Sequence, residues 1–191
     1  SYHEWYGYAV ASAGDVNNDG YGDVIVGAPF DNTVTNQTGL AYLYLGSAAG
    51  LSTTPAWTGA AGSLGCQFGF AVASAGDVNN DGYGDIVVGA PFCDLGAGRT
   101  GAAFCYYGTA TGIDPVPFDT LGGADTLSQY GFAVASADYD GDGYTDVFVG
   151  SPYYSLPDYV ECGRVDGYFG SPAGLADTPS WTYVELTTMA R

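Results

Sequence analysis

Residues 7–30 read GYAVASAGDVNNDGYGDVIVGAPF, and two later stretches repeat this sequence closely. They are GFAVASAGDVNNDGYGDIVVGAPF at 69–92 and GFAVASADYDGDGYTDVFVGSPY at 131–153. Their first loop aspartates, Asp15, Asp77 and Asp138, are spaced 62 and 61 residues apart. A period of tens of residues is typical of repeat architectures, in which each unit covers the apolar face of its neighbour. The 191 residues therefore predict a single domain of three units, at about 1–62, 63–124 and 125–191.

Each unit contains four segments with strand character. In the first unit these are the alternating residues 7–13, the β-branched run 24–28, the aromatic-rich run 40–46 and a segment centred on Trp57. The fourth segments of the other units are centred on Phe118 and Trp181, and no helical periodicity of useful length appears. Four strands repeated at this period predict an all-β fold, a β-propeller built of four-stranded antiparallel blades, with three blades in this chain. Trp57 and Trp181 recur at one repeat position and are predicted to lie in the core.

The charge balance excludes several classes of protein. The formal net charge is -18, because the 21 acidic residues face only three arginines and no lysine. Such a surface repels phosphate, so a nucleic-acid partner is excluded, whereas cations are attracted. No apolar run approaches the roughly 20 residues that a membrane-spanning helix needs, so we expect no membrane span.

The strongest chemical signal is the nine-residue loop between the first two strands of each unit, which reads DVNNDGYGD at 15–23. Side-chain oxygens at positions 1, 3 and 5 and glycine at position 6 are the first half of an oxygen cage for a hard cation. A backbone carbonyl at position 7 and an aspartate at position 9 complete it. Position 12 is a valine in every copy, so these loops are not EF-hands.

Three such loops predict three Ca²⁺ ions per chain, and Mg²⁺ fits less well because it demands a stricter octahedron. In the alternative reading, the aspartates and asparagines only stabilise turns through their own backbone. The predicted ligands are Asp15, Asn17, Asp19, the carbonyl of Tyr21 and Asp23; Asp77, Asn79, Asp81, Tyr83 and Asp85; and Asp138, Asp140, Asp142, Tyr144 and Asp146. The third loop has the most carboxylates and is expected to bind most tightly.

The residues around these loops complete a known pattern. An aromatic-glycine pair precedes the first strand at 6–7, 68–69 and 130–131, and Gly-Ala-Pro or Gly-Ser-Pro follows the second strand. With the loops, this resembles the FG-GAP repeat of the integrin alpha-subunit β-propeller and its bacterial relatives. The resemblance covers essentially the whole chain and implies Ca²⁺ in the loops named above, on one face of a propeller.

The number of repeats departs from the family pattern. Integrin propellers have seven repeats and known propellers about four to eight blades, so three blades cannot close a ring. Either the chain is part of a longer protein, or copies associate. Two chains would supply six blades, and we therefore expect a homodimer that closes a six-bladed ring.

Four cysteines suggest at least one disulfide. Cys93 follows the second strand of its unit and Cys105 lies in the third, so a hairpin disulfide Cys93–Cys105 is expected. Cys66 with Cys162 is then the remaining pair, and buried free thiols are the alternative. Calcium and a disulfide both suit a secreted or cell-surface protein.

Catalysis has little support, because His3 is the sole imidazole and no nucleophile is paired with it. We predict that the chain is not an enzyme. The variable loop 153–163 carries Tyr153, Tyr154 and Tyr159, which could contact a protein or glycan ligand or could simply support packing. The favoured function is extracellular adhesion or protein recognition with structural calcium. A carbohydrate-binding propeller and a purely structural or engineered blade fragment are the alternatives.

Overall fold

A computed structural model describes residues 5–33, 38–96, 98–123, 125–157 and 159–186. These residues form three four-stranded antiparallel sheets, one per repeat. The first comprises β1 (Ala9–Gly14), β2 (Asp23–Ala28), β3 (Leu40–Tyr44) and β4 (Trp57–Gly59). The second comprises β5 (Ala71–Gly76), β6 (Asp85–Ala90), β7 (Ala102–Tyr106) and β10 (Asp119–Gly122). The third comprises β11 (Ala133–Ala137), β12 (Asp146–Ser151), β13 (Arg164–Tyr168) and β14 (Trp181–Val184).

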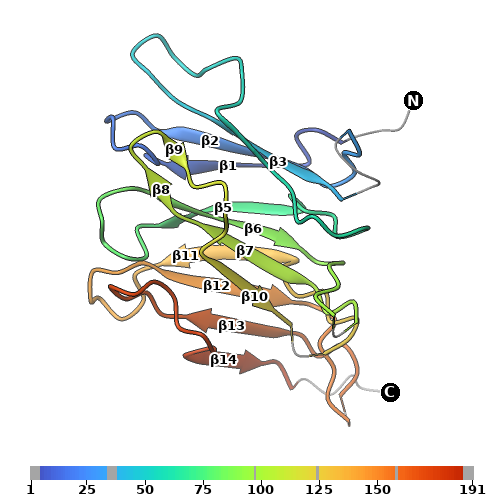
Figure 1. The fold of residues 1–191 in the computed structure, drawn as a ribbon. Helices are drawn as coiled ribbons and strands as arrows, with labels where there is room; N and C mark the ends of the chain where they lie inside the picture. Colours follow the sequence, from blue (N-terminus) through green and yellow to red (C-terminus); the bar gives the residue numbers. More distant parts are fainter. Residues whose placement is uncertain (1–4, 34–37, 97, 124, 158, 187–191) are drawn as a thin grey trace.

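The three sheets are stacked face to face as consecutive blades (Figure 1). In each blade the strands follow one another in chain order from one edge to the other. Of the first strands, β5 contacts both β1 and β11, so the three strands line one shared edge of the stack. The described residues contain no helix that is long and apolar enough to cross a membrane. The predicted all-β fold of propeller blades is confirmed. The exact boundaries of the three units, at about 1–62, 63–124 and 125–191, stay a prediction.

The hydrophobic core consists of two layers, each lying between two blades. Ile25 and Leu43 of the first blade pack with Phe68, Ile86 and Tyr106 of the second. In the next layer, Val87 and Cys105 of the second blade pack with Tyr130, Val147 and Tyr168 of the third. Because β-strand side chains alternate between the two faces, the second blade, which lies in the middle, supplies one set of residues to each layer. Stacking is therefore what buries the sheets.

The outer blades each leave one face uncovered. Trp57 is 9% exposed and packs edge-on against Tyr106 of the next blade, with ring centroids 5.0 Å apart, so its predicted core position is confirmed. Trp181 stands at the same place in the third repeat but is 38% exposed. Its predicted burial is wrong, because none of the described residues forms a further blade against β14.

The spacing from Asp77 to Asp138 is one residue shorter than that from Asp15 to Asp77, and strand register explains the difference. In the first two blades the pairing shifts by one residue at Gly14 and Gly76, which form β-bulges with positive φ of 83° and 71°. The third repeat lacks this glycine, and β11 pairs with β12 without a shift through Ala137 and Asp146. The one-residue difference in period is thus the absence of a bulge.

The second blade has an addition that the sequence pattern did not predict. A short hairpin of β8 (Gly108–Thr109) and β9 (Gly112–Ile113) lies between β7 and β10. Phe118, the predicted centre of the fourth strand, immediately precedes β10 and stacks on Tyr107 with ring centroids 3.7 Å apart.

Candidate metal centres in the repeated loops

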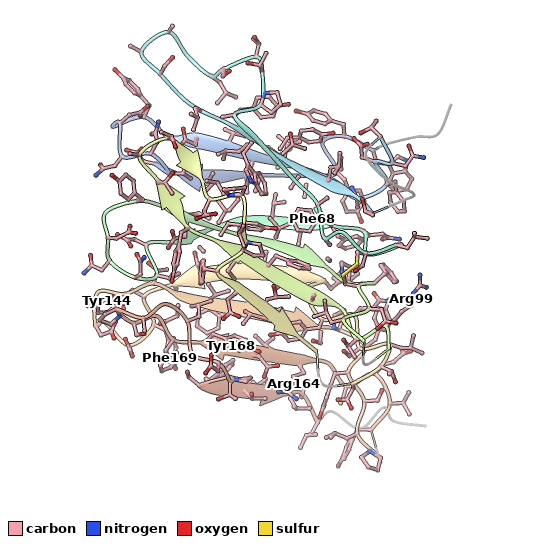
Figure 2. All side chains as sticks on the ribbon, in the orientation of Figure 1. Phe68, Arg99, Tyr144, Arg164, Tyr168 and Phe169 are labelled. Atoms are coloured by element: carbon pink, nitrogen blue, oxygen red, sulfur yellow. A yellow bond between two sulfur atoms is a disulfide. The ribbon has the colours of Figure 1, made fainter. Side chains whose placement is uncertain are left out.

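The three nine-residue loops lie together at one end of the blade stack. Each connects the first strand of a blade to the second, as in β1 to β2. Figure 2 shows Tyr144 of the third loop at this end and Arg99 at the opposite end, where the connections that follow the second strands lie. The sequence therefore places three chemically similar loops on one edge of the molecule.

Within the first loop, side-chain oxygens accept backbone N–H groups. The Asp15 carboxylate accepts from Asp19 N at 3.0 Å and from Gly20 N at 2.8 Å. Asp19 in turn accepts from Tyr21 N at 2.9 Å. Asn18 and Gly20 have positive φ of 54° and 87°, which curls the backbone around the carboxylates. The second loop repeats these bonds, and in the third Asp138 accepts from Gly141 N and Gly143 N.

The aspartate at position 9 is buried and holds the loop to the rest of its blade. In the second blade, Asp85 accepts the Val78 N–H at 2.9 Å with Oδ2 and the Gly108 N–H at 2.9 Å with Oδ1. Asp23 and Asp146 accept the corresponding pairs of N–H groups. This residue therefore joins the start of the loop to the segment that follows the third strand.

Burial also changes the acidity of two of these carboxyls. Desolvation, with a smaller contribution from the charges of Asp81 and Asp77, raises the pKa of Asp85 from 3.8 to about 7, against the lowering effect of the two backbone N–H bonds. Desolvation likewise raises the pKa of Asp23 above its usual range. A carboxylate that is buried near other carboxylates favours a cation nearby, because the cation offsets both effects.

The third loop brings the most carboxylates together. Carboxylate oxygens of Asp138, Asp140 and Asp146 lie within 4.8 Å of one another, and the described residues contain no other such group of three acidic, histidine or cysteine side chains. In the first loop, position 3 is Asn17, whose Nδ2 donates to Asp19 at 3.0 Å. The second loop has the same bond from Asn79 to Asp81. Carboxylates and amide oxygens are the donors that hard cations take, so all three loops have a suitable donor set.

The loops are also connected from blade to blade, which sequence reasoning did not anticipate. The Asp15 carbonyl accepts the N–H of Gly84 in the second blade at 2.9 Å. The Asp77 carbonyl accepts the N–H of Thr145 in the third at 3.0 Å. Asp15 and Asp77 thus each accept a hydrogen bond from the loop of the next blade with the main-chain carbonyl, while the side-chain carboxylate accepts N–H groups of its own loop.

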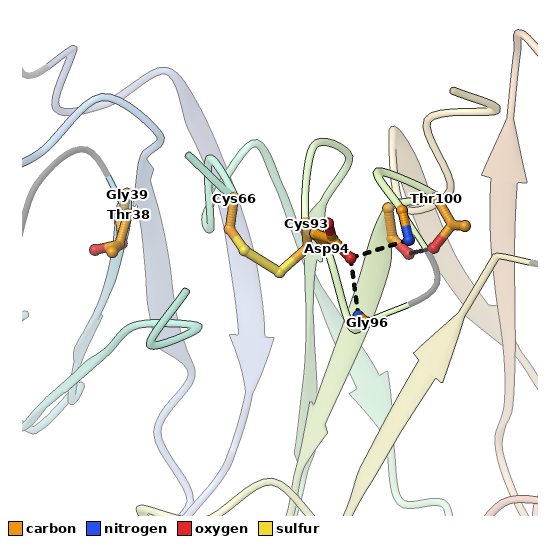
Figure 3. Close-up of a disulfide and its surroundings, with 9 residues drawn as sticks. Thr38, Gly39, Cys66, Cys93, Asp94, Gly96 and Thr100 are labelled. Atoms are coloured by element: carbon orange, nitrogen blue, oxygen red, sulfur yellow. Dashed lines mark hydrogen bonds between the residues drawn. A yellow bond between two sulfur atoms is a disulfide. The ribbon is translucent and has the colours of Figure 1, made fainter. Parts of the chain in front are cut away.

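The predicted disulfide pairs are wrong. Cys66 is bonded to Cys93 (Figure 3). Cys105 and Cys162 are free thiols. Cys105 lies on β7 and pairs with Val87 of β6. Cys93 lies beyond the other end of β6, several residues farther along the chain. A strand rises about 3.3 Å per residue and a disulfide needs Cα atoms within about 7 Å, so that hairpin pair cannot form. Cys66 precedes β5 and lies beside the turn that contains Cys93. The main-chain carbonyl of Cys66 accepts the Phe92 N–H there.

The three candidate ligand tyrosines, Tyr153, Tyr154 and Tyr159, make different contacts, and their role in ligand binding stays a prediction. Tyr154 lies under the guanidinium of Arg164, 5.2 Å from its ring centroid. Tyr159 is in a tight turn in which its N–H and carbonyl bond to Leu156. Tyr153 is 43% exposed and lines a surface cavity with Leu127, Gln129 and Glu161. His3 lies outside the described residues.

The comparisons with known proteins agree with this geometry. The family model described as FG-GAP repeat matches residues 6–44, 68–104 and 130–171, which together make up more than half of the chain. Integrin alpha-8 of Gallus gallus is 38% identical over 157 residues, and integrin alpha-7 of Homo sapiens is 39% identical over 152 residues. These alignments cover 77% and 76% of this chain but only 15% and 12% of the relatives. Integrin alpha-5 of Xenopus laevis is 35% identical over 157 residues. The chain belongs to the FG-GAP repeat family and forms integrin-alpha-like propeller blades.

Proposed function

We propose that this chain is a calcium-binding β-propeller module that serves protein recognition in extracellular adhesion. The observation that carries the calcium part is the triple repetition of one oxygen-rich loop at one end of the stack, with the third loop holding Asp138, Asp140 and Asp146 together. The ligands would be the side chains at positions 1, 3, 5 and 9 and the carbonyls of Tyr21, Tyr83 and Tyr144. Bound calcium would supply positive charge to three acidic loops and hold their turns.

The adhesion part rests on family membership and on chemistry. Integrin alpha subunits are among the relatives, although each aligns over a small fraction of its length. The Cys66–Cys93 disulfide supports an oxidising location, secreted or at the cell surface. The chain has a single histidine and no lysine, so it offers few side chains suited to general-base catalysis near neutral pH, and we therefore favour a binding module over an enzyme.

Calcium titration by calorimetry, combined with thermal melts in calcium and in chelator, tests the calcium proposal. We expect three sites per chain and a melting temperature that rises with calcium, because a ligand that binds only the folded state stabilises it by mass action. The matched control is Asp94→Asn, since Asp94 caps a loop near Gly96 at the opposite end (Figure 3). Identical melts in calcium and chelator, with no heat of binding, would contradict the proposal.

The kind of partner needs a separate experiment. Capture of a protein partner from an extracellular matrix preparation, lost in chelator, supports protein recognition. A glycan array tests the carbohydrate alternative, and the matched variants are Tyr153→Ala, which changes the exposed ring, and Tyr154→Ala, which changes the ring held by Arg164. Glycan binding that only Tyr153→Ala removes would favour a lectin instead.

A further inference from the structure

A polar cavity lies inside the interface between the second and third blades. It has a volume of about 170 Å³ and lies between β10 of the second blade and β13 of the third, so both of its walls belong to this chain. Figure 2 shows Arg164 and Tyr168 on the third blade beside β10. The lining includes Asp119, Leu121, Arg164, Asp166, Tyr168 and Asp177.

Strand register shows what stands at the same place in the interface between the first two blades. Trp57 pairs with Leu43, and Asp119 pairs with Cys105; Leu43 and Cys105 are the fourth residues of β3 and β7. Asp119 therefore has the position in the second blade that Trp57 has in the first. The Trp57 ring fills the first interface by packing against Tyr106. At the second interface this position has a carboxylate instead of an indole ring.

The facing strand has changed in the same sense. Ala102 and Phe104, the first and third residues of β7, are buried in the apolar layer between the first two blades. The first and third residues of β13 are Arg164 and Asp166. Three apolar side chains of the first interface are thus replaced in the second by two carboxylates and a guanidinium. These replacements explain why a polar cavity lies there.

Asp166 is the most buried carboxylate of the cavity, with 2% of its surface exposed. Its Oδ1 atom accepts hydrogen bonds from Arg164 Nε at 2.9 Å and from the Thr182 hydroxyl, and it lies 2.8 Å from Arg164 Nη2. None of the residues that the structure describes donates a hydrogen bond to Oδ2. A buried carboxylate oxygen without a donor is unfavourable, so a ligand that donates to Oδ2 is favoured.

Two further carboxylates make the cavity negative. Asp119 is half-buried and Asp177 is exposed. With Asp166 they supply three negative charges against the single positive charge of Arg164. Desolvation and, after it, the charge of Asp177 raise the pKa of Asp119, which indicates that these carboxylates lack a compensating cation. The cavity therefore favours a positively charged ligand.

The spacing of the carboxylates indicates which kind of cation fits. Among the described residues, the third loop is the only place where ligand atoms of three acidic, histidine or cysteine side chains lie within 4.8 Å of one another. Asp119, Asp166 and Asp177 are therefore too widely spaced for all three to bind one metal ion or one ammonium nitrogen directly. A guanidinium group spreads five N–H donors over a rigid plane and reaches more widely spaced oxygens.

We infer that this cavity binds a guanidinium group on a short alkyl chain, either an arginine side chain of a protein partner or a free alkylguanidine. The guanidinium would donate to Asp166 Oδ2 and to Asp119, and the alkyl chain would pack against Leu121. The cavity is smaller than the roughly 300–1,000 Å³ of sites for drug-sized ligands, which suits a single side chain. This inference goes beyond the proposed function and does not depend on calcium binding.

Calorimetric titration of the 191-residue chain tests the inference. The probes are Nα-acetylarginine N-methylamide and agmatine, and physiological salt weakens general attraction to the net charge of -18. We expect one site per chain for a guanidinium probe and no binding of the neutral analogue Nα-acetylcitrulline N-methylamide. Binding of the arginine probe at least as tight as that of agmatine identifies an arginine side chain as the ligand. Binding of agmatine alone identifies a free alkylguanidine.

Variants of the lining locate the site. Asp119→Asn is expected to weaken binding about tenfold or more, because it removes a charge-assisted hydrogen bond, and Asp177→Asn is expected to weaken it less. Asp119→Trp restores the residue of the first interface and should abolish binding by filling the cavity. Asp94→Asn is the matched control, since it makes the same change in net charge outside the cavity. Thermal melts without probe check that each variant is folded.

Four results would overturn the inference. They are no binding of either guanidinium probe, equal binding of the citrulline analogue, equally tight binding of Nα-acetyllysine N-methylamide, and equal weakening by Asp94→Asn and Asp119→Asn. The last result would show only general attraction to an acidic protein. The lysine result would show that positive charge, and not the shape of the guanidinium, decides binding.

Discussion

The carbonyl oxygen of Gly69 occupies the space that a Cβ atom on Gly27 would need, although the two residues belong to different blades. Gly27→Ala therefore forces the second blade away from the first. We expect it to lower the free energy of unfolding by about 1–3 kcal/mol or more, the usual range for overpacking, in denaturant titrations. Gly150→Ala is the matched control at the same repeat position, where the space is open, and should change stability by no more than about 0.5 kcal/mol. Equal effects of the two variants would contradict this account.

Asp85 offers a test of the buried aspartate at position 9. Asp85→Asn keeps the side-chain shape, but its NH₂ group must face one of the two backbone N–H donors, Val78 or Gly108. We expect a loss of about 1–3 kcal/mol in chelator, the cost of leaving a buried polar group unpaired. Asp94→Asn is the control, because Asp94 accepts its two N–H bonds with a single oxygen that asparagine retains. A stable Asp85→Asn variant in chelator would argue that these bonds are dispensable.

The third loop should bind calcium more tightly than the first two, if the proposed function holds. Position 3 is Asp140 there and asparagine in the other loops, so the third site has one more negative charge. We expect Asp140→Asn to weaken the tightest of three calorimetric binding steps toward the other two. The reciprocal change Asn79→Asp should strengthen the second site. Binding steps that do not follow these exchanges would show that charge count does not set the order of affinity.

Asp119 on β10 lies outside the nine-residue loops, and its raised pKa should make the stability of the folded chain depend on pH. Desolvation raises its pKa above 3.8, and the charge of Asp177 raises it further, against an N–H bond from Thr120. The folded state therefore holds this proton more tightly than the unfolded state, and stability falls as pH rises from 3.8 toward the raised value. Asp119→Asn should flatten the slope of unfolding free energy over this window. Asp177→Asn should reduce it only in part, and an unchanged slope in both variants would contradict the assignment.

The Cys66–Cys93 disulfide closes a loop with a sequence separation of 27 residues. Loop-closure entropy predicts that removing it costs about 3–4 kcal/mol. We expect a reductant to lower the melting temperature of the wild type and of Cys162→Ser equally, but not that of the double variant Cys66→Ser/Cys93→Ser. Thiol counting after denaturation should give two free groups, on Cys105 and Cys162. Four free thiols in unreduced protein would contradict this pairing.

Repetition made much of this molecule predictable from the sequence. Local patterns such as DVNNDGYGD form a tight, oxygen-rich turn from contacts between neighbouring residues alone. The apolar runs at 24–28 and 86–90 become buried strands wherever other layers cover both of their faces. The blades, their strand order and the position of the loops between first and second strands therefore followed from periodicity and spacing alone.

Tertiary structure decided the features that depend on which surfaces meet. Cys66 and Cys93 were not recognisable as a pair, because strand register carries Cys105 away from the turn and brings in a residue from before β5. Trp57 and Trp181 have the same place in the repeat, yet only Trp57 has a following blade to cover it. Sequence patterns specify what a residue can contact within its own unit, but burial and pairing depend on the neighbour that packing brings against it.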